Sequence, residues 1–119
     1  MHEIGIESSL VESIRNGQKT VEGRLGKSRF LQINAGDTLN IREDIWRDGR
    51  VIGAHDDTLQ LKVTQVLYFE SFREMLEAVD YKAAVPAAKT LQDAINKYSE
   101  FYSVKDEEEY GVVAIFFEL

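Results

Sequence analysis

The chain has 119 residues, of which 44% are hydrophobic and 29% are charged, and its formal net charge is −7. This length and composition predict a single globular domain over residues 1–119, and the absence of cysteine excludes disulfides, thiolate zinc sites and cysteine nucleophiles. The chain begins without a signal-peptide pattern and contains no run of about 18 apolar residues, so we expect a cytoplasmic protein.

The first half of the chain predicts one helix followed by strands. Residues 7–16 carry an apolar stripe, with Ser8 or Ser9 as a helix N-cap and Gly17 where a helix would end. Alternating side chains and the turn signal Asp48-Gly49 then indicate short strands linked by hairpins. The predicted strands are residues 18–24, 38–45, 50–52 and 59–69, with loops at 27–30 and 53–57.

The second half predicts helices and one last strand. A Ser or Thr followed three residues later by an acidic residue marks a helix start, and this pattern occurs at Ser71, Thr90 and Ser103. Residues 80–89 are predicted to be irregular, and the apolar run 112–117 is predicted to be a strand buried on both faces. The fold class is therefore α+β, with a mixed, mostly antiparallel sheet curled into a small β-barrel and flanked by helices.

Charge is distributed unevenly along the chain. Residues 15–50 contain eight basic and five acidic residues, whereas residues 70–119 contain five basic and eleven acidic ones. A polyanion responds to the local field of a cleft more than to the total charge. The N-terminal half is therefore a candidate anion-binding face, although an ordinary mixed surface has the same composition.

Three charged side chains follow the first helix within six residues. On a regular strand Glu22 and Arg24 share one face and Lys19 points the other way, unless Gly23 introduces a bulge. A Glu–Arg pair fixes a guanidinium that can make two parallel hydrogen bonds, and a nearby lysine adds a second cation for a phosphate. An exposed strand with a surface ion pair fits the same pattern.

The spacing Gly17-x-Lys19-x-x-Glu22-x-Arg24 resembles the signature of the activating-signal-cointegrator homology (ASCH) domain, and residues 72–76, 98–103 and 107–115 resemble later segments of that family. The resemblance implies a PUA-like β-barrel with a basic cleft beside it that binds RNA or a nucleotide. We expect no cofactor, no metal and no membrane partner. The candidate ligand-binding residues are Lys19, Thr20, Glu22, Arg24, Lys27, Arg29, Tyr102 and Ser103.

Two other functions remain open at this point. Some proteins that resemble this domain hydrolyse acetylated cytidine with a lysine, a threonine and a glutamate, and others are ribonucleases. The family's lysine falls on Lys19, but its threonine position holds Glu22, so Lys19 and Glu22 are catalytic candidates only if the chain is an enzyme. The second alternative is a protein-docking module that uses the acidic C-terminal half.

The aromatic residues and the histidine-containing loop allow more than one interpretation. Tyr98, Phe101 and Tyr102 are candidates for stacking on bases, but their helical spacing favours core packing for Phe101. Trp46 is either a nucleobase platform or part of the packing at the barrel rim. His55, followed by two aspartates, lacks a defined ligand geometry and is interpreted as part of a solvated turn rather than a metal site.

Overall fold

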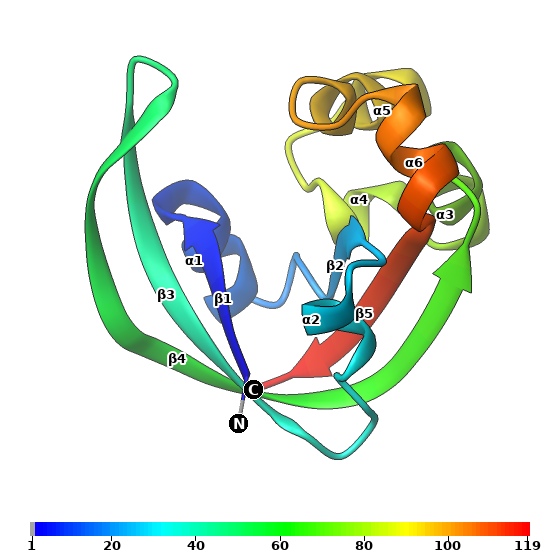
Figure 1. Ribbon diagram of the computed structural model, residues 1–119. Coiled ribbons are helices and arrows are strands. Elements are labelled where there is room, and N and C mark those ends of the chain that lie inside the picture. The colour runs from blue at the N-terminus through cyan, green and yellow to red at the C-terminus, as the bar shows by residue number, and fades with distance from the viewer. Residues whose placement is uncertain (1) are drawn as a thin grey trace.

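The computed structural model describes residues 2–119 and contains one five-stranded sheet with helices packed around it (Figure 1). No helix in this range is long and apolar enough to cross a membrane. In chain order the elements are β1 His2–Glu7, α1 Ser8–Arg15, β2 Val21–Leu25, α2 Ser28–Leu31, β3 Thr38–Arg47, β4 Arg50–Phe69, α3 Phe72–Ala78, α4 Tyr81–Ala84, α5 Leu91–Ser99, α6 Val104–Tyr110 and β5 Val112–Glu118.

The strand order β1-β3-β4-β5-β2 leaves β1 and β2 as the two edges of the sheet. The β3–β4, β4–β5 and β2–β5 ladders are antiparallel and β1–β3 is parallel, which confirms the α+β class with a mostly antiparallel sheet. The predicted closed barrel is wrong, because no backbone ladder joins β1 to β2 within residues 2–119. A side chain bridges these two edges instead: Arg24 of β2 donates from Nη2 to the Gly5 carbonyl of β1 at 2.8 Å.

Several elements differ from the prediction in extent. Strand β1 was not predicted, although its buried Ile4 and Ile6 alternate with less buried neighbours as a strand requires. Residues 53–57 form part of one long strand, β4, rather than a loop. The β3–β4 ladder accommodates extra residues by register shifts between Ile41 and Glu43 and between Ile45 and Trp46. Short helices α2 and α4 occupy the predicted loop at 27–30 and part of the irregular segment.

The caps of α3, α5 and α6 follow the prediction, whereas the cap predicted at Ser8 or Ser9 is wrong: both serines lie inside α1, whose N-cap is Glu7 with no side-chain cap hydrogen bond. Gly17 adopts a φ of 83° directly after the first helix. The side chains of Ser71, Thr90 and Ser103 each accept a hydrogen bond from the backbone N–H three residues later, at the starts of α3, α5 and α6. These caps fix where the helices begin and hence which of their faces meet the sheet.

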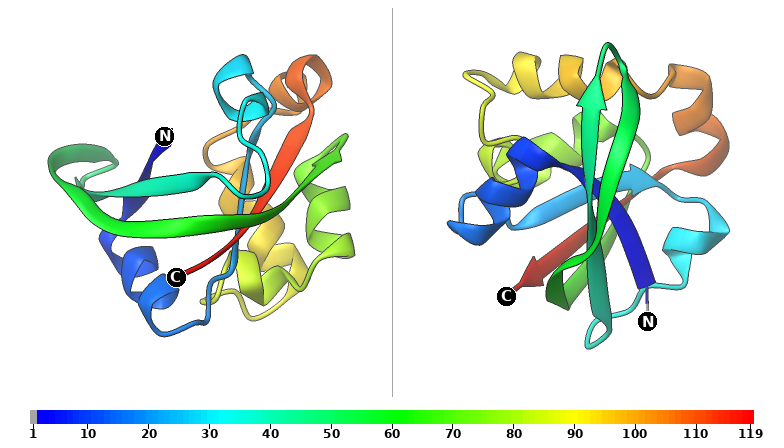
Figure 2. Two further views of the ribbon diagram at one scale, coloured as in Figure 1. Left: turned by 90° about the horizontal axis from the view of Figure 1, so that it is seen from below. Right: turned by 90° about the vertical axis from the view of Figure 1, so that its left-hand side faces the viewer.

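Strand β5 carries the core on both of its faces, as predicted. Val113, Ile115 and Phe117 belong to a cluster with α1, β1, β3 and β4, whereas Val112 and Ala114 belong to a second cluster with β2 and helices α3, α4 and α5. The β3–β4 hairpin projects on the side of the molecule opposite helices α3 to α6 (Figure 1). Strand β4 continues from this hairpin into the rest of the sheet, as the two further views show (Figure 2). The hairpin therefore faces helices α4 and α5, and the edge strands β1 and β2 lie between them.

Candidate ligand-binding site

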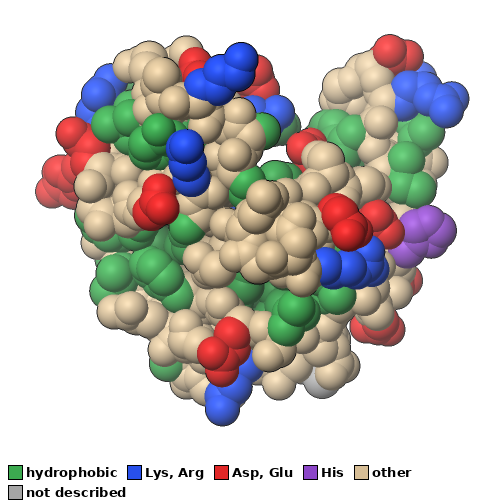
Figure 3. Space-filling model, turned by 180° about the vertical axis from the view of Figure 1, so that it is seen from behind, with side chains coloured by type: hydrophobic (Ala, Val, Ile, Leu, Met, Phe, Trp, Pro, Cys, Tyr) green, Lys and Arg blue, Asp and Glu red, His purple; other side chains and the backbone are tan. Residues whose placement is uncertain are grey.

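A cleft of about 770 Å³ lies between the β3–β4 hairpin and helices α4 and α5, and the edge strands β1 and β2 both contribute to its wall. The space-filling view from behind shows the molecule hollowed between these two halves (Figure 3). The cleft lies where the edge strands β1 and β2 come close without a backbone ladder between them, and both strands line it.

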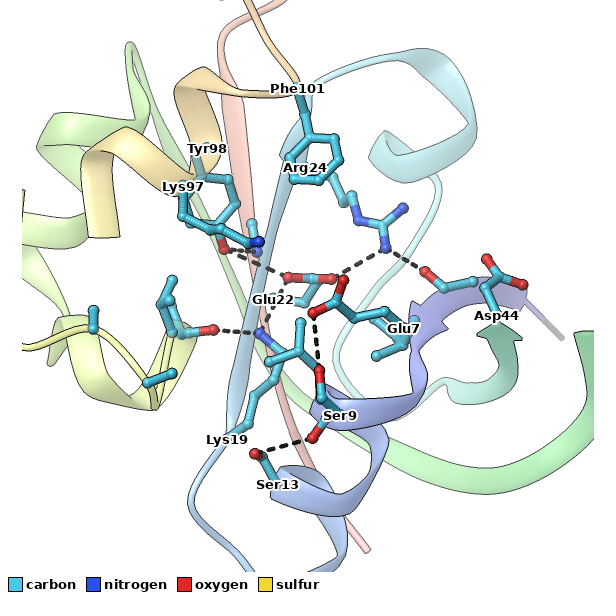
Figure 4. Close-up of a pocket in the computed structure, with 18 of the residues that line it drawn as sticks. Glu7, Ser9, Ser13, Lys19, Glu22, Arg24, Asp44, Lys97, Tyr98 and Phe101 are labelled. Atoms are coloured by element: carbon cyan, nitrogen blue, oxygen red, sulfur yellow. Dashed lines mark hydrogen bonds and ion pairs between the residues drawn. The ribbon is translucent and has the colours of Figure 1, made fainter. Parts of the chain in front are cut away.

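The carboxylate of Glu22 is the centre of the site, with a cation on each side of it (Figure 4). Its Oε1 accepts from Lys19 Nζ at 3.2 Å and from the Tyr98 hydroxyl at 3.5 Å, and its Oε2 accepts from Arg24 Nη2 at 3.1 Å. The Tyr98 hydroxyl in turn accepts from the Gly23 N–H at 3.3 Å. Glu22 is buried, so this network compensates a charge that would be costly without partners.

Lys19 is fully enclosed, with 1% of its surface exposed. Its Nζ donates to the Val21 carbonyl at 2.9 Å, to Glu22, and to the Ala84 carbonyl at 2.6 Å. Three acceptors match the three donors of an ammonium, whereas a neutral amine has only two N–H groups. Lys19 lies on the same side as Glu22, contrary to the flat-strand prediction, because it precedes β2 and does not follow the alternation of that strand.

The pKa values of these groups follow from burial and mutual attraction. Burial lowers the pKa of Lys19 from its ordinary value, against the opposing effect of the Glu22 carboxylate. Burial alone would raise the pKa of Glu22, but Lys19 and Arg24 together hold it below its ordinary value. Burial and the neighbouring Glu22 raise the pKa of Tyr98 well above its ordinary value, so its hydroxyl stays protonated and donates to Glu22.

Arg24 reaches the cleft itself. Its side chain is 18% exposed, and its guanidinium lies 5.5 Å from the centre of the Phe30 ring. Both hydrogen bonds that it makes to residues 2–119 come from Nη2, to Glu22 and to the Gly5 carbonyl. A guanidinium has five N–H donors, so Nη1 and Nε remain for a ligand while Glu22 and Gly5 hold the group in place.

Lys19, Glu22 and Arg24 together form the floor of the cleft, and Gly23 allows this floor to pack closely against the helices behind it. A Cβ there would lie 2.7 Å from Sδ and 2.8 Å from Cε of Met75, and 3.2 Å from the Tyr98 hydroxyl. Helices α3 and α5 therefore approach the strand more closely than a side chain at this position would permit. Gly23 provides close approach rather than the bulge considered from sequence, because the β2–β5 ladder keeps an unbroken register through it.

The structure brings together five of the eight predicted ligand-binding residues. Lys19, Glu22, Arg24, Arg29 and Tyr102 line the cleft. The other three do not line it: Thr20 is in backbone hydrogen bonds with residues 83 and 117, Lys27 lies over the Tyr110 ring, and Ser103 caps α6. The three charged residues of the motif lie together in the cleft, whereas the residues predicted beside them in sequence mostly lie outside its lining.

Sequence reasoning missed most of the wall opposite the helices. Arg42, Asp44 and Trp46 all line the cleft, and their spacing of two residues along β3 is the signal that places them on one face. Arg42 donates from Nε to Asp44 Oδ1 at 2.7 Å and from Nη2 to Oδ2 at 3.1 Å. Phe101 was expected in the core but is 52% exposed at the mouth of the cleft.

Basic residues outnumber acidic ones in the lining. No group of three or more His, Cys, Asp or Glu side chains that could hold a metal ion occurs within residues 2–119. The basic residues of the lining are Lys19, Arg24, Arg29, Arg42, Lys89 and Lys97, and the acidic ones are Glu7, Glu22, Asp44 and Asp93.

Comparison with known proteins places the chain in a family. The model of the ASCH domain matches residues 4–119. The crystal structure of hypothetical protein PH0355 is 32% identical with a TM-score of 0.83, and the match covers 98% of this chain and 96% of that one. The solution NMR structure of protein PF0455 from Pyrococcus furiosus is also 32% identical, with a TM-score of 0.74 and coverage of 99% and 96%. No curated protein matches. The chain therefore belongs to the ASCH domain family, with a PUA-like α+β fold whose sheet stays open.

Proposed function

We propose that the cleft binds single-stranded RNA or a nucleotide, with Arg24 as the residue that contacts the ligand. The observation that carries the proposal is a guanidinium held by a buried carboxylate and a backbone carbonyl, with donors left over at the floor of a cleft. Such a fixed guanidinium suits a phosphate or a base carbonyl, because its direction is set before the ligand arrives. Membership of the ASCH family supports the same class of ligand.

Glu22 and Lys19 have different roles in this proposal. Glu22 orients Arg24, and a carboxylate has about four acceptor sites, of which three are used by Lys19, Tyr98 and Arg24. The remaining site on Oε2 can accept from the exocyclic amine of a base. Lys19 was expected to hold a phosphate, but its three donors are engaged inside the protein, so we assign it to positioning Glu22.

The test is the affinity of Arg24→Ala for a short unpaired RNA, measured by fluorescence anisotropy at several salt concentrations. We expect the affinity to fall about tenfold or more, and the slope of log affinity against log salt to decrease by about 0.7 if Arg24 contacts one phosphate. Arg73→Ala is the matched control, since Arg73 is exposed on α3 and does not line the cleft. Absence of RNA binding by the unaltered protein, or equal binding by both variants, would refute the proposal.

We expect no hydrolysis of acetylcytidine by this chain. An ammonium that donates to three acceptors has no lone pair to serve as a base, and Glu22 occupies the position of the family's threonine. Release of cytidine from acetylcytidine, followed by chromatography, measures this directly. Turnover that disappears in Glu22→Gln would contradict the expectation and make the chain an amidohydrolase.

A further inference from the structure

Two exposed aromatic rings from opposite walls meet at the mouth of the cleft. Trp46 belongs to β3 in the hairpin and Phe101 follows α5, and their side chains are 42% and 52% exposed. Their ring centroids are 6.1 Å apart at an interplanar angle of 71°, an edge-to-face contact. Both residues line the same cleft as Glu22 and Arg24, and their exposure places the contact where the cleft meets solvent.

The neighbouring residues on β3, and the stacked rings of the helical wall, determine where Trp46 and Phe101 lie. Trp46 lies on the same face of β3 as Arg42 and Asp44, and the register shift between Ile45 and Trp46 places its extra residue, Ile52, on β4. On the other wall Tyr102 stacks on the buried Phe72 at 5.0 Å, and Phe72 stacks on Tyr98 at 4.4 Å. The helical wall is thus braced by stacked rings, whereas Trp46 is carried by an exposed hairpin.

We propose that Trp46 and Phe101 form an aromatic clamp that takes one unpaired base between their rings. This inference rests on the proposed RNA-binding function and adds a second point of recognition to the Arg24 floor. A base that enters stacks on both rings and replaces one edge-to-face contact by two stacking contacts. A paired base in a duplex is already stacked on its neighbours, so the clamp selects single strands.

Charge at the clamp favours a nucleic-acid ligand. Lys97 Nζ lies 5.8 Å from the centre of the Phe101 ring and lines the cleft with Lys89. An aromatic platform with cations beside it suits a base whose phosphate is close by, which is the combination that single-strand binders use.

The experiment uses the intrinsic fluorescence of Trp46, the single tryptophan of the chain. The full chain is titrated with a short unpaired RNA and, separately, with the same RNA annealed to its complement. We expect the single strand to quench Trp46 emission in a saturable way and the duplex to leave it unchanged, because only an unpaired base can stack on the ring.

Phe101→Leu removes one half of the clamp and keeps an apolar side chain. We expect its affinity for the single strand, measured by anisotropy, to fall about tenfold. Tyr68→Leu is the matched control, since Tyr68 is 60% exposed on β4 and lies outside the cleft lining, and it is expected to bind like the unaltered protein. Thermal unfolding of both variants checks that each is folded.

The outcomes separate the clamp from the proposed function. RNA binding that depends on Arg24, with unchanged Trp46 emission and full affinity in Phe101→Leu, would overturn the clamp and leave the RNA-binding proposal standing. Equal quenching by duplex and single strand would also overturn it. Absence of any RNA binding would remove both.

Discussion

Replacement of Glu22 by alanine is expected to lower the free energy of unfolding by about 3–5 kcal/mol. The change leaves the buried Lys19 and the partly buried Arg24 without the carboxylate that lies between them. A loss of this size is a large part of the stability of a small domain, which is about 5–15 kcal/mol. Urea unfolding followed by circular dichroism measures the change.

Glu12→Ala is the control for this prediction. Glu12 also pairs with a basic residue, Arg15 at 3.3 Å, but both side chains are largely exposed. We expect a loss of less than about 1 kcal/mol for this variant, because solvent screens exposed pairs. If the two alanine variants lost the same amount of stability, burial of the Glu22 network would not be the cause.

The same carboxylate predicts a dependence of stability on pH. The pKa of Glu22 is lower in the folded protein than in the unfolded chain, so its contribution is complete above the ordinary carboxyl pKa of about 4.3 and is lost as the pH falls through the folded value. The stability difference between the unaltered protein and Glu22→Gln should therefore be largest near pH 7 and should shrink below about pH 4. Asp37 and Asp106, whose pKa values are also lowered, are present in both proteins and cancel in the difference.

Replacement of Lys19 by methionine is expected to destabilise the protein by a similar amount, about 3–5 kcal/mol. Methionine keeps much of the apolar stem but removes all three donors. The carbonyls of Val21 and Ala84 then lose their bonds to Nζ, and Glu22 keeps only one of its two cations. Each buried acceptor without a partner adds to the cost.

Lys97→Met provides the matched control for the lysine. The Lys97 side chain is 44% exposed and lies 3.6 Å from Glu100, so the same substitution there is expected to change stability by less than about 1 kcal/mol. Urea unfolding of both variants gives the comparison. A Lys19→Met protein as stable as the unaltered protein would contradict the prediction, because it would show that the three hydrogen bonds of Nζ do not support the fold.

The sequence by itself determined the starts of α3, α5 and α6 and the last strand, and it singled out three charged residues that lie together in the cleft. Ser71, Thr90 and Ser103 were identifiable because a cap acts over three residues and needs no distant partner. The run 112–117 was identifiable because a strand buried on both faces is apolar throughout. The residues from Lys19 to Arg24 were predicted to form a site because their spacing resembles the ASCH signature, whose charged side chains are neighbours in the chain.

Only the tertiary structure decided whether the sheet closes and which residues form the walls of the cleft. Strand β1 pairs with β3, more than thirty residues away, so its short pattern was not interpretable locally. Lys19 is buried because Ala84 provides an acceptor from a distant helix. Trp46 and Phe101 meet because β1 and β2 do not pair with each other, so that the hairpin and helix α5 face one another across the cleft. Local patterns fix caps and strands, whereas contacts between distant segments depend on how the whole chain packs, and these contacts form the cleft.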